Sequence, residues 1–226
     1  MNSMVLEPPQ IDLHQNDLET GMNSDPLEAL VQKRGRLFVV SGPSGVGKDS
    51  VLSALFASAD CPPNLLRCIT ATTRAPRATE IPGHDYFFFT REEFENRIET
   101  EFFLEHATYN GNYYGTPHDY PEQQRDLGMD VVLKIEVQGA LAVKSRVPDA
   151  ILVFIAPPSW SELERRLRSR ATDNESEVIR RLEIARLEMA IAPKYDYFVI
   201  NDLVDDCVSS LRSVVMAERC RIKKDV

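Results

Sequence analysis

The sequence predicts an α/β fold in which a parallel β-sheet is covered by helices on both faces. Apolar, β-rich runs recur at residues 37–40, 131–137, 150–156 and 195–201, and each is followed by a helical pattern. Near-continuous apolar runs joined by helices are typical of parallel strands that are buried on both sides. A region rich in Gly, Pro, Thr and aromatic residues interrupts this alternation and predicts an inserted, mostly β subdomain over residues 69–117.

The composition indicates a single compact domain. The chain has 226 residues, of which 43% are hydrophobic, and this is enough for a sizeable core. The formal net charge of −9 argues against broad binding to nucleic acid or to anionic membranes, because both need a basic face. No apolar run approaches the roughly 20 residues of a membrane span. We therefore expect no nucleic-acid or membrane partner. A phosphorylated ligand would need a locally basic pocket. We expect the protein to be a monomer or a homodimer.

Residues 1–32 carry six acidic residues and no Lys or Arg, and their Pro and Asn content predicts a loosely ordered tail ahead of one domain over residues 33–224. This segment lacks the cationic and apolar regions of a secretion signal and the arginines of a transit peptide, although a targeting segment could have been removed upstream. We therefore expect a cytoplasmic protein.

The four cysteines give no sign of a metal site or a disulfide framework. They form no C-x-x-C pair, and no histidine stands at metal-ligand spacing from them. We expect reduced thiols that are mostly buried, as is usual in a cytosolic protein. These residues are Cys61, Cys68, Cys207 and Cys220.

The stretch SGPSGVGKDS, residues 41–50, has the glycine spacing of a phosphate-binding loop. The glycines let successive backbone N–H groups face an anion, and the helix that follows adds positive potential at its N-terminus. Lys48 would reach the β- and γ-phosphates of a nucleoside triphosphate. A glycine turn that merely connects strand to helix is the disfavoured alternative, because the loop directly follows an apolar strand. The residues assigned to the triphosphate are Gly42, Pro43, Ser44, Gly45, Val46, Gly47, Lys48 and Asp49.

A second group of candidate phosphate ligands lies in the inserted region. Arg74 and Arg77 stand three residues apart in a Pro-containing loop, where two guanidinium groups could hold one phosphate. Taken alone, two solvated arginines are the more common explanation. Tyr86 could belong to the β core or offer its hydroxyl to a phosphate.

A third basic group lies in two charged helical stretches over residues 165–190. Arg166 and Arg170 are one helical turn apart, and Arg181 follows beyond a loop at 171–174. The spacing of Asn174 and Glu177 is that of a capping box, which predicts that a helix restarts there. Solvated arginines are again the more common explanation, since Glu162 can pair with Arg166 across one turn.

Taken together, these motifs resemble the guanylate kinase family in order and spacing, from about Gly35 to the C-terminus. The resemblance implies a P-loop NTPase-type core over residues 35–68, 118–164 and 191–224, a GMP-binding subdomain over 69–117 and a helical lid over 165–190. It also implies an ATP:GMP phosphotransferase of purine metabolism with Mg²⁺ as cofactor, acting on GMP and on dGMP. The segments that carry it are GPSGVGK, TTRAPR, GHDYFF, FLEHATYNGNYYGTP, VQG, FIAPPS and RLRSRAT.

Site residues follow from this resemblance, position by position. The GMP phosphate would be held by Arg74, Arg77, Tyr86 and Tyr114. The guanine base would meet Thr70, Glu105, Thr116 and Glu136. The transferring phosphoryl group would be surrounded by Lys48, Arg74, Arg166, Arg170 and Arg181. Asn201 matches a position beside the adenine.

The chemistry of guanine agrees with this assignment. Guanine presents its N1–H and its amino group side by side, and the Glu105 carboxylate can accept both, while the Thr116 hydroxyl can donate to O6. Adenine has a bare acceptor at N1 and would leave that carboxylate unpaired, at a cost of about 1–3 kcal/mol or more.

Three positions depart from the family pattern. Asp49 stands where Ser or Thr is usual, and Lys134 and Glu136 stand where Asp-x-Asp is usual. Asp49 could coordinate Mg²⁺ directly or through a water, or could serve only as an acid in the first turn of a helix. Lys134 could add charge near the phosphates or face away. Glu136 keeps a carboxylate on a longer side chain.

Two other functions share the predicted fold. Guanylate-kinase-like modules of scaffolding proteins bind peptides without turnover, but they typically lose the loop lysine and the lid arginines that this chain keeps. A kinase of another phosphorylated small molecule is the second alternative, and the combination of Glu105 with Thr116 favours guanine over it.

Overall fold

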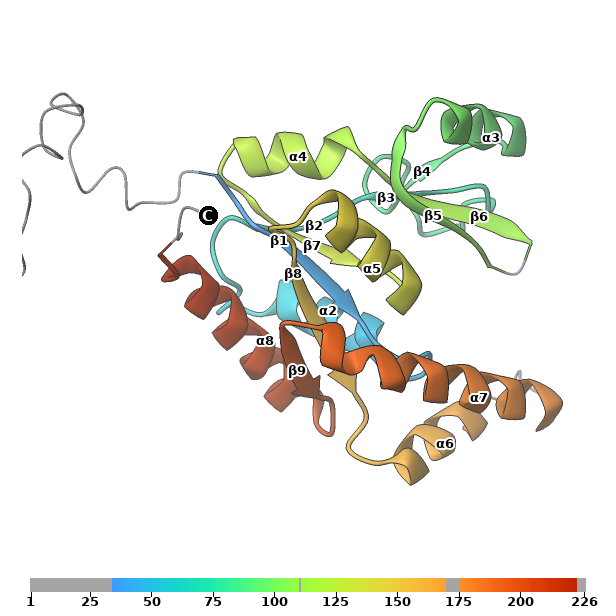
Figure 1. The fold of residues 1–226 in the computed structure, drawn as a ribbon, viewed down its shortest axis with the longest axis vertical. Helices are drawn as coiled ribbons and strands as arrows, with labels where there is room; N and C mark the ends of the chain where they lie inside the picture. Colours follow the sequence, from blue (N-terminus) through green and yellow to red (C-terminus); the bar gives the residue numbers. More distant parts are fainter. Residues whose placement is uncertain (1–33, 110, 170–174, 223–226) are drawn as a thin grey trace, which may run out of the picture. The chain divides into compact units, whose positions relative to one another are not determined.

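The structure is a computed structural model, and it describes residues 34–109, 111–169 and 175–222. The tail predicted for residues 1–32 lies outside the described residues. The main sheet has five parallel strands in the order β2-β7-β1-β8-β9. The predicted fold class is therefore confirmed (Figure 1). The strands are β1 (Leu37–Ser41), β2 (Leu65–Arg67), β7 (Asp130–Lys134), β8 (Ile151–Ala156) and β9 (Tyr197–Ile200).

The alternation of side chains along β1 builds a core on each face of this sheet. Phe38 and Val40 point to one face, where they join α2 (Lys48–Ala57) and α8 (Val204–Arg219). Leu37 and Val39 point to the other face, where the cluster includes α5 (Val137–Arg146) and half-buried Tyr120 of α4 (Asp119–Asp126). Because side chains alternate along a strand, the continuous apolar run is explained by burial on both sides.

One predicted strand is too long. The apolar run at 131–137 ends as a strand at Lys134, and α5 begins at Val137. Lys134 pairs with Val40, the last residue but one of β1, after which β1 turns into the phosphate loop. Beyond Lys134 the Ile135 N–H still donates to the carbonyl oxygen of Val40 at 3.3 Å, and the extended Glu136 then becomes the N-cap of α5.

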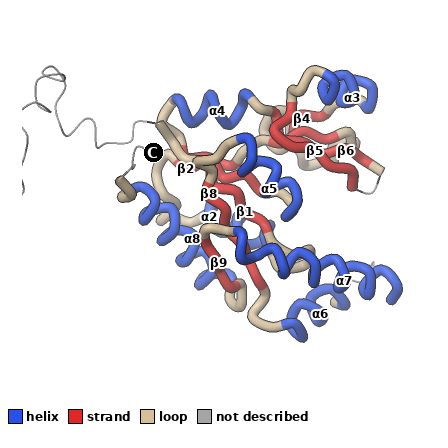
Figure 2. Tube along the Cα trace, viewed as in Figure 1, coloured by secondary structure: helices blue, strands red, loops and turns tan. Residues whose placement is uncertain are grey.

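The inserted region forms its own four-stranded sheet in the order β4-β3-β6-β5. Figure 2 shows a helix beside this sheet, α3 (Arg91–Glu99), which the prediction of a mostly β region missed. Its local signal is a capping box between Thr90 and Glu93, and it buries Phe94 against Phe103 with the ring centroids 4.2 Å apart. The strands are β3 (Thr70–Thr72), β4 (Tyr86–Phe88), β5 (Phe103–Tyr109) and β6 (Asn112–Pro117).

Two helices between β8 and β9 occupy the segment predicted to form a lid. They are α6 (Trp160–Arg168) and α7 (Glu175–Ile191), which pack on each other through Leu163, Leu167 and Val178. The helix restart is where the capping pattern predicts it, although Asn174 itself lies outside the described residues. The 3-10 helix η2 (Ala192–Lys194) connects α7 to β9.

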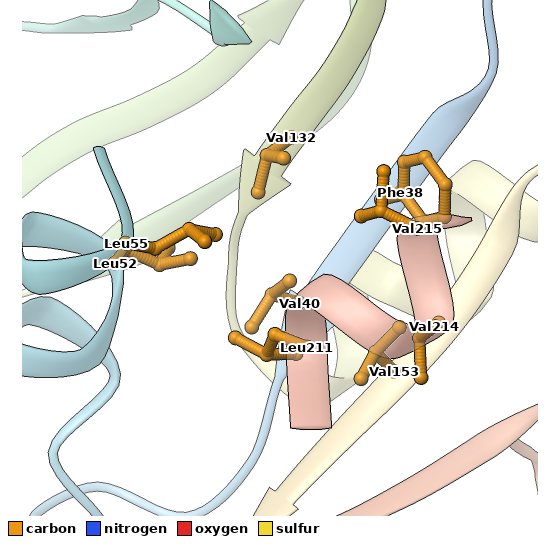
Figure 3. Close-up of a pocket in the computed structure, with 9 residues that line it drawn as sticks. All are labelled: Phe38, Val40, Leu52, Leu55, Val132, Val153, Leu211, Val214 and Val215. Carbon is orange, nitrogen blue, oxygen red and sulfur yellow. The ribbon is translucent and has the colours of Figure 1, made fainter. Parts of the chain in front are cut away.

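A small cavity of about 10 Å³ lies inside the core between the sheet, α2 and α8. Figure 3 shows that side chains such as Val40, Leu52 and Leu211 surround it. Its lining is entirely apolar, so it cannot satisfy the polar groups of a nucleotide. The candidate site lies instead at the ends of the strands.

The cysteines are all free thiols. Cys68 and Cys207 are buried and Cys61 is half-buried, as predicted, but Cys220 is exposed because it caps the C-terminal end of α8. None of the helices in the described ranges has the length and apolar character that a membrane span requires.

Candidate active site

The phosphate loop is closed by glycines that have no room for a side chain. Gly42 has φ +146°, and a Cβ there would lie 2.1 Å from the carbonyl oxygen of Ile155. Gly47 has φ +96° and is the N-cap of α2, and its Cβ would lie 2.6 Å from Nδ2 of Asn201. Glycine alone adopts these dihedral angles without strain. The loop therefore follows from the glycine spacing of the sequence.

Lys48 lies in the first turn of α2 and folds back over this loop. Its Nζ donates to the carbonyl oxygens of Gly42 at 2.5 Å and Pro43 at 3.3 Å, and only 9% of the residue is exposed. Burial lowers the pKa of Lys48, while the carboxylates of Glu136 and Glu188 act in the opposite direction. The ammonium group is thus held against the first two residues of the loop.

Asn201 joins the end of β9 to the loop. Its Nδ2 donates to the carbonyl oxygen of Val46 at 2.7 Å, and the residue is 3% exposed. Its Oδ1 is buried without a hydrogen-bond partner among the described residues. A buried acceptor of this kind is costly unless a donor reaches it.

Arg166 and Arg181 reach the loop from α6 and α7. Arg166 pairs with Glu162, as predicted, and its Nη1 donates to the carbonyl oxygens of Asn201 at 2.9 Å and Val46 at 3.3 Å. The Nη2 of Arg181 donates to the hydroxyl of Ser44 at 2.7 Å. The structure thus brings both arginines to the same loop as Lys48, whereas Arg170 lies outside the described residues.

Glu188, also on α7, was missed by the sequence analysis. Burial raises its pKa to about 7, the nearby Glu136 adds to the shift, and Lys48 and the backbone amide of Ser44 oppose it. Its Oε2 is buried without a hydrogen-bond partner in the part of the chain that the structure describes. The signal in the sequence is helical spacing, since Glu188 lies two turns after Arg181 and both interact with Ser44.

The second half of the site lies on the inserted sheet. Glu105 and Thr116 are direct partners across β5 and β6, and the Thr116 hydroxyl donates to Oε1 of Glu105 at 2.6 Å. Burial raises the pKa of Glu105, and the bonds from Thr116 partly offset this. A Cβ on Gly139 of α5 would lie 2.9 Å from Oε2 of Glu105, so this carboxylate faces the core domain. Thr116 is fully buried, while Glu136 is exposed at the start of α5.

Arg74 lies among aromatic rings on the same sheet. It pairs with Glu80 at 2.7 Å, and its guanidinium carbon lies 5.7 Å from the ring centroid of Tyr86. Tyr86 in turn lies edge-on to Tyr114, with the ring centroids 6.5 Å apart. The hydrogen bond from Arg74 contributes most to the lowered pKa of Glu80. The structure thus brings Arg74, Tyr86 and Tyr114 together, and Glu80 is a partner that the sequence analysis missed.

Arg77 and Thr70 have less defined positions in the site. The backbone N–H of Arg77 donates to Oε2 of Glu80 at 2.8 Å, but its side chain is exposed and does not join that of Arg74. Thr70 is half-buried on β3, where it pairs in register with Tyr86.

Asp49 is the acidic residue of the phosphate loop. Its carboxylate forms an ion pair with Lys134 and lies 4.0 Å from Arg67. Of the two alternatives for Lys134, facing away is therefore wrong. No group of three or more His, Cys, Asp or Glu side chains suited to a metal occurs within the described ranges. A metal here would depend on Asp49 and on oxygens of a bound ligand.

Comparisons with known proteins agree with this geometry. A model of the family described as guanylate kinase matches residues 34–218. The guanylate kinase of Caldanaerobacter subterraneus subsp. tengcongensis is 44% identical over 195 residues, which cover 86% of this chain and 93% of that protein. The guanylate kinase of Streptococcus thermophilus is 46% identical over 194 residues, 86% of this chain and 92% of that protein.

A solved structure gives the same answer. The crystal structure of guanylate kinase from Anaplasma phagocytophilum superposes with a TM-score of 0.65 at 30% identity, covering 84% of this chain and 89% of that chain. The resemblance inferred from the motifs is confirmed: the chain belongs to the guanylate kinase family.

Proposed function

We propose that this chain transfers the γ-phosphoryl group of ATP to GMP, giving ADP and GDP, and that it also accepts dGMP. The observation that carries the proposal is the Glu105–Thr116 pair, because it offers a carboxylate and a hydroxyl side by side, with the carboxylate next to Gly139 of α5. Guanine N1–H and its amino group match the carboxylate. The Thr116 hydroxyl would match O6 by turning its single proton from Glu105 to the base. Thr70 and Glu136 would complete the base pocket.

The GMP phosphate would bind to the guanidinium and phenol groups of the inserted sheet. Arg74 is already aligned by Glu80 and lies over Tyr86, so a phosphate would replace or share an existing partner rather than order a free side chain. Tyr114 lies against Tyr86 and would supply a second hydroxyl. Arg77 would have to turn inward from its exposed position.

ATP would bind in the loop formed by Gly42, Pro43, Ser44, Gly45, Val46 and Gly47. Lys48 would exchange its bonds with the Gly42 and Pro43 carbonyls for bonds with phosphate oxygens. The adenine amino group would donate to the unpaired Oδ1 of Asn201. Arg166 and Arg181, with Arg170, would surround the transferring phosphoryl group, where positive charge and in-line positioning do most of the catalytic work.

Mg²⁺ would be held at Asp49. A carboxylate is a hard oxygen ligand, and Mg²⁺ in such sites is held by one or two carboxylates together with substrate phosphates and water. The side chain of Asp49 is 76% exposed at the start of α2, so it can face both the solvent and a bound nucleotide. When bound, the ion would neutralise charge on the phosphates.

We propose the domain division that the motifs imply, with the GMP subdomain at 69–117 and the lid at 165–190. We also propose that the protein acts in the cytoplasm as a monomer or homodimer without a nucleic-acid partner. Sedimentation at working concentration tests the oligomeric state.

A coupled ADP-release assay with ATP and Mg²⁺ tests the function. We expect turnover with GMP and dGMP and little with AMP, CMP or UMP. Glu105→Ala should raise KM for GMP by roughly 10- to 100-fold, the equivalent of losing a buried hydrogen-bond partner, with little change in KM for ATP. Lys48→Ala should lower turnover with every acceptor. Glu99→Ala, at an exposed position on α3, is the matched control for Glu105.

Two outcomes would contradict the proposal. The absence of GMP-dependent turnover would favour a peptide-binding module, while equal rates with AMP and GMP would exclude the assigned base pocket.

A further inference from the structure

The Asp49–Lys134 ion pair joins two elements at the edge of the phosphate loop. Asp49 follows Lys48 in the first turn of α2, and Lys134 is the last residue of β7. The Asp49 side chain is 76% exposed and that of Lys134 only 21% exposed. The lysine is therefore the more buried partner of the pair and the carboxylate the more exposed one.

The surroundings of Asp49 are strongly cationic. Burial acts to raise its pKa, but the hydrogen bond and charge of Lys134, with Arg67 and Lys48, outweigh burial and the pKa lies below its usual range. A carboxylate beside the position of the β-phosphate would repel a triphosphate unless a neighbouring cation offsets its charge.

The other cations cannot supply this offset as well as Lys134 does. Lys48 donates to the carbonyl oxygens of Gly42 and Pro43, and its charge would be taken by the phosphates. Arg67 lies farther from Asp49, at 4.0 Å, and its side chain is 47% exposed against 21% for Lys134, so its attraction is the weaker of the two. Lys134 makes the direct contact.

We propose that Lys134 is a positioning residue for nucleotide binding: its ammonium group holds the Asp49 carboxylate and offsets its charge, so that a nucleoside di- or triphosphate can bind beside it. The inference rests on the proposed ATP site. It predicts that replacing Lys134 alone weakens nucleotide binding more than replacing Lys134 and Asp49 together.

The experiment measures ADP and ATP binding by isothermal titration calorimetry, with excess EDTA and with Mg²⁺, for a double-mutant cycle. The variants are Lys134→Gln, Asp49→Ser and the double substitution, and thermal unfolding of each without ligand checks the fold. Lys134→Gln should weaken ADP binding about 10-fold or more in EDTA and less with Mg²⁺, because the metal also neutralises phosphate charge. In EDTA the double variant should bind ADP more tightly than Lys134→Gln alone, and Lys134→Arg should retain binding.

Lys144→Gln is the matched control, because Lys144 of α5 forms a similar ion pair with Asp196 at 3.3 Å. It should leave ADP affinity unchanged. Equal losses for Lys134→Gln and for the double variant would overturn the proposal, as would unchanged affinity in Lys134→Gln.

The two proposals fail in different ways. A parent protein that binds ATP but does not phosphorylate GMP would contradict the proposed function. The coupling between Asp49 and Lys134 in nucleotide binding could then still be measured. A parent protein that phosphorylates GMP but shows no coupling between the two positions would contradict the charge pair alone. A parent protein that binds no nucleotide would contradict both.

Discussion

At the scale of single residues, the phosphate loop is defined by positions where only one residue type fits. Gly47 shows this best, because two separate requirements meet there: φ of +96° and a close approach to Nδ2 of Asn201. Asn201 makes that approach in order to donate to the carbonyl oxygen of Val46. A change at position 47 therefore affects the loop and the end of β9 together.

We predict that Gly47→Ala destabilises the protein by about 2–4 kcal/mol, from roughly 1–2 kcal/mol of left-handed backbone strain and a further cost for displacing Asn201. It should also reduce ATP affinity. Gly83→Ala is the control, because Gly83 has φ +77° but no atom within 4 Å of a Cβ. Urea denaturation of both variants separates the cost of backbone strain, which the two share, from the cost of the contact with Asn201, which only Gly47→Ala has. Equal losses would show that the contact with Asn201 has no energetic effect.

The sequence could predict the groups around the loop but not their partners. The spacing of the glycines and Lys48 specifies the phosphate loop, and the family resemblance specifies Asn201; the structure brings these groups together. Glu80 gave no signal and Glu188 only its helical spacing from Arg181, because an acid in a loop or on a charged helix is usually solvated. Only the tertiary structure shows that Glu80 accepts from Arg74 and that Glu188 lies beside the phosphate loop.

At the scale of elements, long apolar strands were predicted well and short or polar elements were missed. The sequence of β8, ILVFIA, is entirely apolar and indicates a buried strand, and all six residues are buried in the structure. β2 has three residues and is defined by its pairing with β7. α3 and α4 have few apolar residues, and each buries a narrow strip, such as Phe94. α3 depends on its capping box, while α4 has no side-chain cap; both depend on tertiary contacts that a pattern of apolar residues does not show.

The helix α7 carries charged groups on the face that meets the loop. Arg181, Ala185 and Glu188 lie on one face; Ala185 is fully buried, and the two charged residues interact with Ser44. A small residue between them allows the helix to approach the loop. This arrangement places a carboxyl group with a pKa of about 7 next to Lys48.

We predict that Glu188→Gln stabilises the ligand-free protein at pH 8 and has little effect at pH 5. The pKa of Glu188 rises from 4.5 in the unfolded chain to about 7 in the folded one. The unfolded state therefore releases its proton first, and the folded state loses stability as pH rises from 4.5 to 7. Glutamine cannot ionise and so removes this loss of stability. With solvent screening taken into account, the loss is on the order of 1 kcal/mol in the free energy of unfolding.

Urea denaturation at several pH values measures the effect. Glu183→Gln, at an exposed position on the same helix, is the control. A difference between Glu188→Gln and the parent that does not change with pH would contradict the assignment.

At the scale of the whole molecule, stability and chemistry are provided by different parts. Apolar clusters on both faces of the parallel sheet hold the core, and a separate cluster that includes Phe94 and Phe103 holds the inserted sheet. The charged groups of the candidate site lie outside these clusters, on the phosphate loop, on α6 and α7 and on the inserted sheet. The fold should therefore form without its substrates or a metal ion.

We predict that EDTA abolishes phosphoryl transfer but leaves the melting temperature of the nucleotide-free protein unchanged within about 1 °C, because no described group of ligands could bind a structural metal. ATP with Mg²⁺ should raise the melting temperature, since binding at 100 times Kd adds about 2.7 kcal/mol. ATP in EDTA should raise it less, because Asp49 then faces phosphates whose charge no metal offsets. Differential scanning fluorimetry measures all four conditions. A fall in the melting temperature in EDTA without nucleotide would mean that a metal stabilises the fold itself.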